Sequence, residues 1–130
     1  MSLGDIVAAQ DTRFEYVDTP EWGGRVRIAS LTGTERQTLV VAMRKDQKAH
    51  GDELAMVRFA FRVVVASLVD EDGQHVSDQD VAVEQLADKN MEPTQRVFDA
   101  CRRLSGLGQE ELEQRLDELK ATPSASSPTD

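Results

Sequence analysis

Two short runs near the N-terminus alternate between polar and apolar residues, which is the pattern of strands with one buried face. The first run covers residues 13–18 and the second covers residues 25–29. Successive side chains of a strand point to opposite faces, and we predict that the aromatic and β-branched residues of each run supply one buried face. The pair Gly23 and Gly24 supplies the positive φ that a tight turn needs. We therefore predict an antiparallel β-hairpin over about 13–29, packed on helices because an isolated hairpin is only marginally stable.

After the hairpin, the apolar residues recur every three to four positions, which is the period of an α-helix. Thr32 and Glu35 have the spacing of a capping box, Ser77 is placed as an N-cap, and Pro93 is placed at a first helical position. Gly106 stands where a glycine commonly ends a helix. The pattern predicts a weak helical turn over 4–10, helices over about 33–49, 53–69, 78–89, 93–105 and 109–120, and a disordered tail over 121–130.

The most apolar segment, residues 54–69, fits two structures. A strand is indicated by the alternation of Val57, Phe59, Phe61 and Val63 with less apolar residues. A helix is indicated by a second stripe, formed by Leu54, Val57, Phe61, Val64, Val65 and Leu68. The segment is much longer than a usual strand of about 5–6 residues, which favours the helix. We predict that it is the central and most buried helix, apolar nearly all round.

Length and composition place the chain in the class of small globular proteins. Its 130 residues suit one domain, and 39% of them are hydrophobic. The fold class that we predict is α+β, with an N-terminal antiparallel β-hairpin packed on a bundle of four to five helices in a single domain over 1–120. The net charge of −9 disfavours nucleic acid as a partner, because phosphates repel an acidic surface. Arg58 and Arg62 interrupt the most apolar segment, so we expect no membrane span and a cytoplasmic location.

A search for catalytic and metal-binding patterns finds no complete set. The acidic turn at residues 70–73 would need carboxylates at Leu68 and Gln79 to be an EF-hand loop. His50 and His75 have no second ligand at zinc-site spacing. The only cysteine, Cys101, lies within an apolar helical stripe, which is typical of a small core residue rather than a nucleophile. We therefore expect no cofactor, no metal and no enzymatic activity.

Two features of the sequence are candidate partner-binding sites. Trp22, the only tryptophan, lies at the predicted hairpin tip, where it either closes over the core or anchors an interface. The last predicted helix carries an apolar stripe between strongly charged faces. This leucine seam consists of Leu112, Leu116 and Leu119. It either docks on its own domain or meets a partner helix.

The order of several short motifs resembles the small tail assembly chaperones of long-tailed bacteriophages. Residues 17–24 (VDTPEWGG) resemble the "V-x-x-P-E-W-G-G" hairpin of these proteins. Further similar segments are residues 26–36, 66–73, 77–80, 97–100 and 104–107. Each motif is short, and their order and spacing over about residues 5–107 carry more of the resemblance than any one of them.

The resemblance implies a function in virion assembly. Such chaperones bind the tape-measure protein, which is a very long helical chain, in the cytoplasm of the bacterial host cell. The tail-tube protein is a second partner that the resemblance suggests. They keep the client soluble until tube subunits polymerise around it. Two alternatives stay open at this point, namely a structural tail-completion or virion protein, and a small protein-binding adaptor unrelated to phages.

Overall fold

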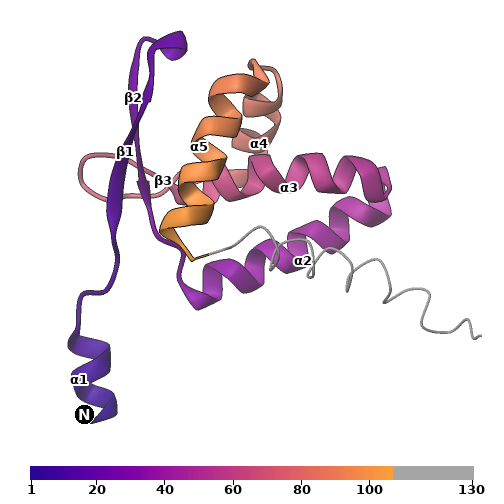
Figure 1. Cartoon of the computed structure of the whole chain (residues 1–130). Helices are drawn as coiled ribbons and strands as arrows, with labels where there is room; N and C mark the ends of the chain where they lie inside the picture. Colours follow the sequence, from indigo (N-terminus) through magenta and orange to yellow (C-terminus); the bar gives the residue numbers. More distant parts are fainter. Residues whose placement is uncertain (107–130) are drawn as a thin grey trace, which may run out of the picture.

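The computed structural model describes residues 1–106, which form a small antiparallel sheet and five α-helices (Figure 1). The predicted α+β class, with an N-terminal hairpin and helices, is thereby confirmed. The predicted helix over 109–120 and the predicted tail over 121–130 lie outside the described residues. In chain order the elements are α1 (Leu3–Ala8), β1 (Phe14–Thr19), η1 (Pro20–Trp22), β2 (Gly24–Ala29), α2 (Gly33–His50), α3 (Asp52–Ser67), β3 (Leu68–Val69), α4 (Gln79–Ala87) and α5 (Met91–Leu104).

Strands β1 and β2 form the predicted hairpin, with Val17 opposite Val26. Gly23 follows the 3₁₀ turn η1 with a φ of 87°, a conformation that glycine adopts without strain. The face that is buried differs from the prediction, however. Val17 lies against the core, whereas Phe14 and Tyr16 face outward on the opposite side of the strand. Their rings lie under the guanidinium groups of arginines from β2, and this stacking lets them stay at the surface.

The central helix ends two residues earlier than the sequence predicts. Helix α3 ends at Ser67, and Leu68 and Val69 form the short strand β3. These two residues pair with Ile28 and Arg27 on the open edge of β2, which gives the sheet order β1-β2-β3. Pairing with this edge stabilises an extended conformation for Leu68 and Val69, a conformation that β-branched and large apolar residues adopt readily. The helical period of the sequence does not reveal that β2 has an open edge.

The helix boundaries show which capping signals the sequence predicts correctly. Thr32 and Glu35 form the predicted capping box at the start of α2. Gly106, with a φ of 73°, stands directly after α5 as predicted. Helix α4 is capped by Asp78 rather than Ser77, because the Asp78 carboxylate accepts a hydrogen bond from the Val81 N–H. Helix α5 begins at Met91, so Pro93 lies at its third position, where a missing N–H also costs nothing.

The core joins the hairpin to α2, α3 and α5. Ile28, Val63, Val97 and Cys101 are completely buried there. The predicted burial of Cys101 is confirmed, and burial raises the pKa of its thiol to about 11. A smaller cluster, made of Phe61, Val65 and Val83, joins α3 to α4. The helices α4 and α5 thus cover the same part of α3 from two sides (Figure 1).

Candidate functional site

Three apolar side chains near the start of α3 are exposed to solvent. Leu54 is 53% exposed, Met56 is 40% exposed and Val57 is 48% exposed. We call these three residues the α3 apolar face, in which Val57 lies between the other two around the helix and Leu54 and Met56, two positions apart, point to nearly opposite sides. The sequence predicts that Leu54 and Val57 lie on the buried stripe of the central helix, and this prediction is wrong.

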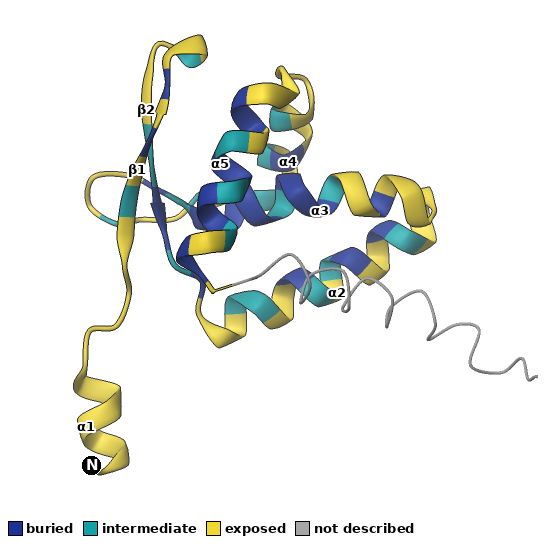
Figure 2. Ribbon diagram, viewed as in Figure 1, coloured by how far each residue is buried: buried dark blue, intermediate teal, exposed yellow. Residues whose placement is uncertain are grey.

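The position of these residues on the helix explains why they are apolar and yet exposed. Val57 precedes Phe61 by four positions, and Met56 precedes Ala60 by four, so each pair shares one side of α3. Phe61 and Ala60 are buried. Figure 2 shows the change along α3, from a largely exposed first half to a buried second half. The α3 apolar face is therefore the continuation of the core stripe past the point where α4 and α5 cover it.

An ionic network holds α3 between its neighbours just beyond this face. Asp46 on α2 is 3% exposed, and its carboxylate accepts hydrogen bonds from Arg62 Nε at 2.6 Å and Nη2 at 2.9 Å. Arg58 lies 3.4 Å from the same carboxylate and 2.6 Å from Glu84 on α4. Arg62 also reaches Asp80 at the start of α4, at 3.1 Å. The two arginines thus tie α2, α3 and α4 together.

The charges of this network reinforce one another. Burial alone would raise the pKa of Asp46, but the hydrogen bonds from Arg62 and the charges of Arg62 and Arg58 outweigh burial and hold the pKa below its ordinary value. The same contacts raise the pKa of Arg62, chiefly through its hydrogen bonds to Asp46. Asp46 and Arg62 therefore stay ionised near neutral pH, so their ion pair holds α3 in a fixed position on α2.

The hairpin tip carries Trp22, the first candidate from the sequence. Glu21 beside it forms an ion pair with Arg96 of α5, at 2.7 Å, and the hydrogen bond from Arg96 lowers the pKa of Glu21 to about 2. Arg96 also donates to the Asp18 carbonyl oxygen. Trp22 is half-buried and packs against the main core cluster. Most simply it closes the core beneath the tip; its use as an interface anchor stays a prediction.

Of the candidates from the sequence, Trp22 is the one that lies within residues 1–106. Trp22 belongs to η1 at the hairpin tip, and this tip lies far in space from the first turns of α3 (Figure 1). Leu112, Leu116 and Leu119 lie outside the described residues. Sequence reasoning missed the α3 apolar face itself. Residues 54–69 are apolar nearly all round in the sequence, which was the available signal. Which half of this helix is covered depends on the positions of α4 and α5, and the sequence pattern does not give these positions.

A shallow hollow of about 610 Å³ lies on another side of the helices, between α2 and the start of α4. Its lining mixes apolar side chains such as Leu39 and Val83 with charged ones such as Lys45, Arg62 and Asp80. The arginine and aspartate are already paired with each other in the ionic network.

Other chemistry is sparse in the part of the chain that the structure describes. Within residues 1–106, no three His, Cys, Asp or Glu side chains are grouped closely enough to hold a metal ion. His75 lies 3.3 Å from Glu35, a single contact rather than a ligand set. Among the same residues, no helix has the length and apolar character needed to cross a membrane.

Comparison with protein-family models found no match, and searches of curated proteins and of solved structures likewise found none.

Proposed function

We propose that the protein is a chaperone, not an enzyme, and that the α3 apolar face binds an amphipathic helix of a client protein. The single observation that carries this proposal is the exposure of Leu54, Met56 and Val57 on a helix that Asp46, Arg58 and Arg62 hold in place. Exposed apolar side chains on a fixed helix, here Val57 flanked by Leu54 on one side and Met56 on the other, can dock the apolar face of another helix.

The size of the face indicates weak binding by each copy. Complete burial of one such side chain contributes about 1.5–3 kcal/mol. Leu54, Met56 and Val57 are already about half buried, so covering them would contribute roughly 1 kcal/mol each before the cost of association. Useful affinity then requires several copies on one long client, whose contacts add by avidity. An acidic protein with weak individual contacts would keep such a client in solution and release it readily.

The client that we propose is the tape-measure protein of a long-tailed bacteriophage or prophage, in the cytoplasm of the bacterial host cell. The support for this assignment is the resemblance of residues 17–24, 26–36, 66–73, 77–80, 97–100 and 104–107 to tail assembly chaperones. A very long helical chain presents many apolar stripes, which matches a binder with one small apolar face. Tail-tube subunits that polymerise around the client would then displace the weakly bound copies.

Co-expression tests the proposal. The full chain, expressed with the tape-measure protein of the same genome, is expected to raise the soluble fraction of that protein severalfold. Val57→Glu puts a charge in the α3 apolar face and should abolish the increase, because an unpaired charge is costly to bury. Val41→Glu is the matched control: Val41 is 58% exposed in the middle of α2, outside the face, so its replacement should have no effect.

Two results would contradict the proposal. If Val57→Glu remains folded and solubilises the client as well as the unchanged chain, the α3 apolar face is not the client site. If the unchanged chain has no effect and is found instead in purified virions, the protein is a structural tail component rather than a chaperone.

A further inference from the structure

The first helix of the chain carries an apolar side that its own domain leaves uncovered. Leu3 and Val7 are each 75% exposed, and Ile6 is 58% exposed. Ile6 and Val7 follow Leu3 by three and four positions, so the three side chains share one side of α1, and Asp5 points away from that side. We call these three residues the α1 stripe. Apart from Met1, no large apolar side chain within residues 1–106 is more exposed than they are.

Helix α1 is formed although its own domain does not support it. Ser2 and Asp5 form a capping box at its start. None of its six residues is buried, however, and Figure 2 shows the helix exposed over its whole length. A helix of this length is marginal in water, because most helices in proteins depend on packing of their apolar side. The α1 stripe therefore calls for a surface outside its own domain.

The segment that carries α1 starts from a fixed point and stands clear of the domain. The Arg13 N–H donates to Ser30 Oγ at 3.0 Å, and the Arg13 carbonyl oxygen accepts from the Ser30 N–H at 2.8 Å. Residues 9–12 join this anchor to α1, which lies beyond the N-terminal end of β1 (Figure 1). We call residues 3–12 the N-terminal arm. Another molecule can receive this arm without any change in the rest of the domain.

The hollow between α2 and the start of α4 offers the apolar surface that the stripe lacks. Leu39 and Val83 are buried and line the hollow, and Val41 beside them is 58% exposed, as much as Ile6. Its volume of about 610 Å³ is within the range of roughly 300–1,000 Å³ that is typical of binding pockets. We propose that the α1 stripe of one molecule docks in the hollow of a second copy of this chain, and that the second copy returns the same contact.

The charges around the hollow favour an acidic arm. The N-terminal arm contains Asp5 and Asp11 and no basic side chain. Lys45 lines the hollow and is exposed, and within residues 1–106 no carboxylate lies at ion-pair distance from it. The acidic groups of the hollow are each engaged within the chain, namely Asp80 with Arg62 at 3.1 Å, Glu35 with His75 at 3.3 Å and Asp78 with the Val81 N–H at 3.2 Å. The charge left without a partner at the hollow is therefore positive.

A two-fold exchange gives the contact the size of a stable interface. One short helix in one hollow is a small contact, but a symmetric dimer uses the same contact twice. Each copy would contribute its arm of ten residues and the fourteen residues that line its hollow. Together these fall in the range of roughly 20–30 residues per side that standard interfaces use.

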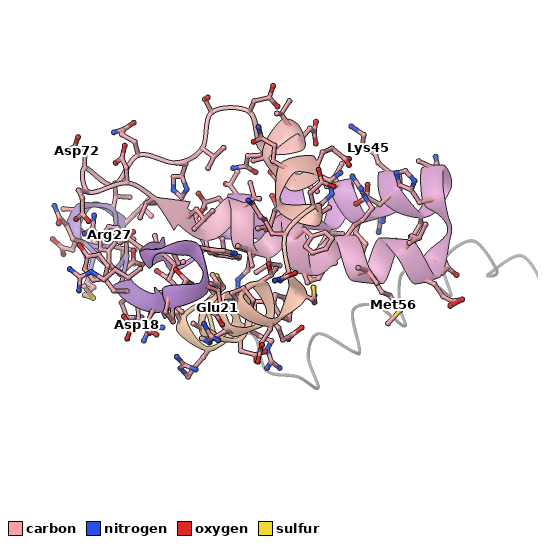
Figure 3. All side chains as sticks on the ribbon, turned by 90° about the horizontal axis from the view of Figure 1, so that it is seen from above. Asp18, Glu21, Arg27, Lys45, Met56 and Asp72 are labelled. Atoms are coloured by element: carbon pink, nitrogen blue, oxygen red, sulfur yellow. The ribbon has the colours of Figure 1, made fainter. Side chains whose placement is uncertain are left out.

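The exchange and the proposed client contact use different residues. Leu54, Met56 and Val57 are not among the residues that line the hollow. In Figure 3, Met56 projects from the side of the helices opposite Lys45, which marks the hollow. The dimer therefore does not depend on the proposed function, and variants that disrupt the exchange should solubilise the client as well as the unchanged chain does.

Sedimentation of the full chain over about a hundredfold range of concentration tests the exchange. The unchanged chain is expected to shift from the mass of one molecule towards twice that mass as the concentration rises. Ile6→Glu places a charge in the α1 stripe and should raise the dissociation constant of the dimer at least about tenfold. Ala8→Glu is the matched control, because Ala8 is exposed on α1 but lies off the stripe, and the constant should not change. Circular dichroism should show the same fold for both variants.

Disulfide crosslinking identifies the surface that receives the stripe. The full-length Val7→Cys and Val41→Cys chains are mixed and oxidised mildly. Native Cys101 is completely buried, so it should not compete with the two introduced thiols. The exchange predicts that most disulfide-linked dimers contain one chain of each kind.

Three results would overturn the proposal. The first is a chain that stays a single molecule over the whole concentration range, and the second is equal dimerisation of Ile6→Glu and Ala8→Glu. The third is a disulfide that mainly joins two Val7→Cys chains, because the α1 stripes would then pair with each other and not with the hollow. The co-expression result judges the proposed function separately in each case.

Discussion

Asp46 is the buried charge on which the position of α3 depends. Its side chain is 5% exposed and has two arginine partners, so its removal leaves Arg58 and Arg62 with only their exposed partners on α4. Breaking a buried pair on one side is costly, and we expect Asp46→Ala to lower the free energy of unfolding by about 3 kcal/mol. Asp80→Ala removes an exposed partner of Arg62 and should cost less than about 1 kcal/mol. Urea unfolding measures both, and equal losses would mean that the network is not centred on Asp46.

The same residue predicts a dependence on pH. The pKa of Asp46 is lower in the folded protein than its ordinary value of 3.8. A lowered carboxyl pKa contributes stability above 3.8, and this contribution is lost as the pH falls through the folded-state value. The loss of stability in acid, below about pH 4, should therefore be shallower in Asp46→Asn than in the unchanged chain. A parallel acid profile for the two proteins would contradict this assignment.

At the scale of the element, α3 is divided into a covered and an uncovered half. Phe61 is 9% exposed and packs against Val83, whereas Val57, one turn earlier on the same side, is 48% exposed. Phe61→Ala should cost about 3–5 kcal/mol, the usual range for a buried phenylalanine. Val57→Ala should cost less than about 1 kcal/mol, because little burial is lost. If the two losses in urea unfolding were similar, the boundary of the core along α3 would lie elsewhere.

The elements also show how far sequence reasoning reaches in this chain. Helical periodicity, the capping box at Thr32 and the paired glycines of the hairpin are local signals, and each predicts its element correctly. Leu54 and Val57 were misplaced because periodicity identifies an apolar side of a helix but not the length over which neighbours cover it. Strand β3 was missed for the same kind of reason: Leu68 and Val69 are extended only because β2 offers an open edge.

The exposed aromatic residues of the hairpin have a similar explanation. Alternation correctly assigns Phe14 and Tyr16 to one face of β1, but which face turns inward depends on partners distant in sequence. Arg25 lies 3.8 Å from the Tyr16 ring centre and Arg27 lies 4.2 Å from that of Phe14. The Tyr16 hydroxyl also donates to Glu71, at 2.6 Å. The exposure of the α3 apolar face was equally hard to predict from the sequence, because it depends on how the helices pack and not on the composition of α3.

At the scale of the whole molecule, a net charge of −9 accompanies a small set of exposed apolar side chains on a fixed helix. The face is too small for tight binding by one copy, which favours a long client with repeated sites. This inference depends on one claim, namely that the α3 apolar face contacts the helical client.

Photo-crosslinking tests that claim most directly. A photoreactive amino acid at Val57, in the full chain co-expressed with the tape-measure protein, would react with whatever covers that position. The account predicts a covalent product with the tape-measure protein from position 57, and little or none from the control position Val41. A product of equal yield from both positions, or none from position 57 while the client is still kept soluble, would contradict it.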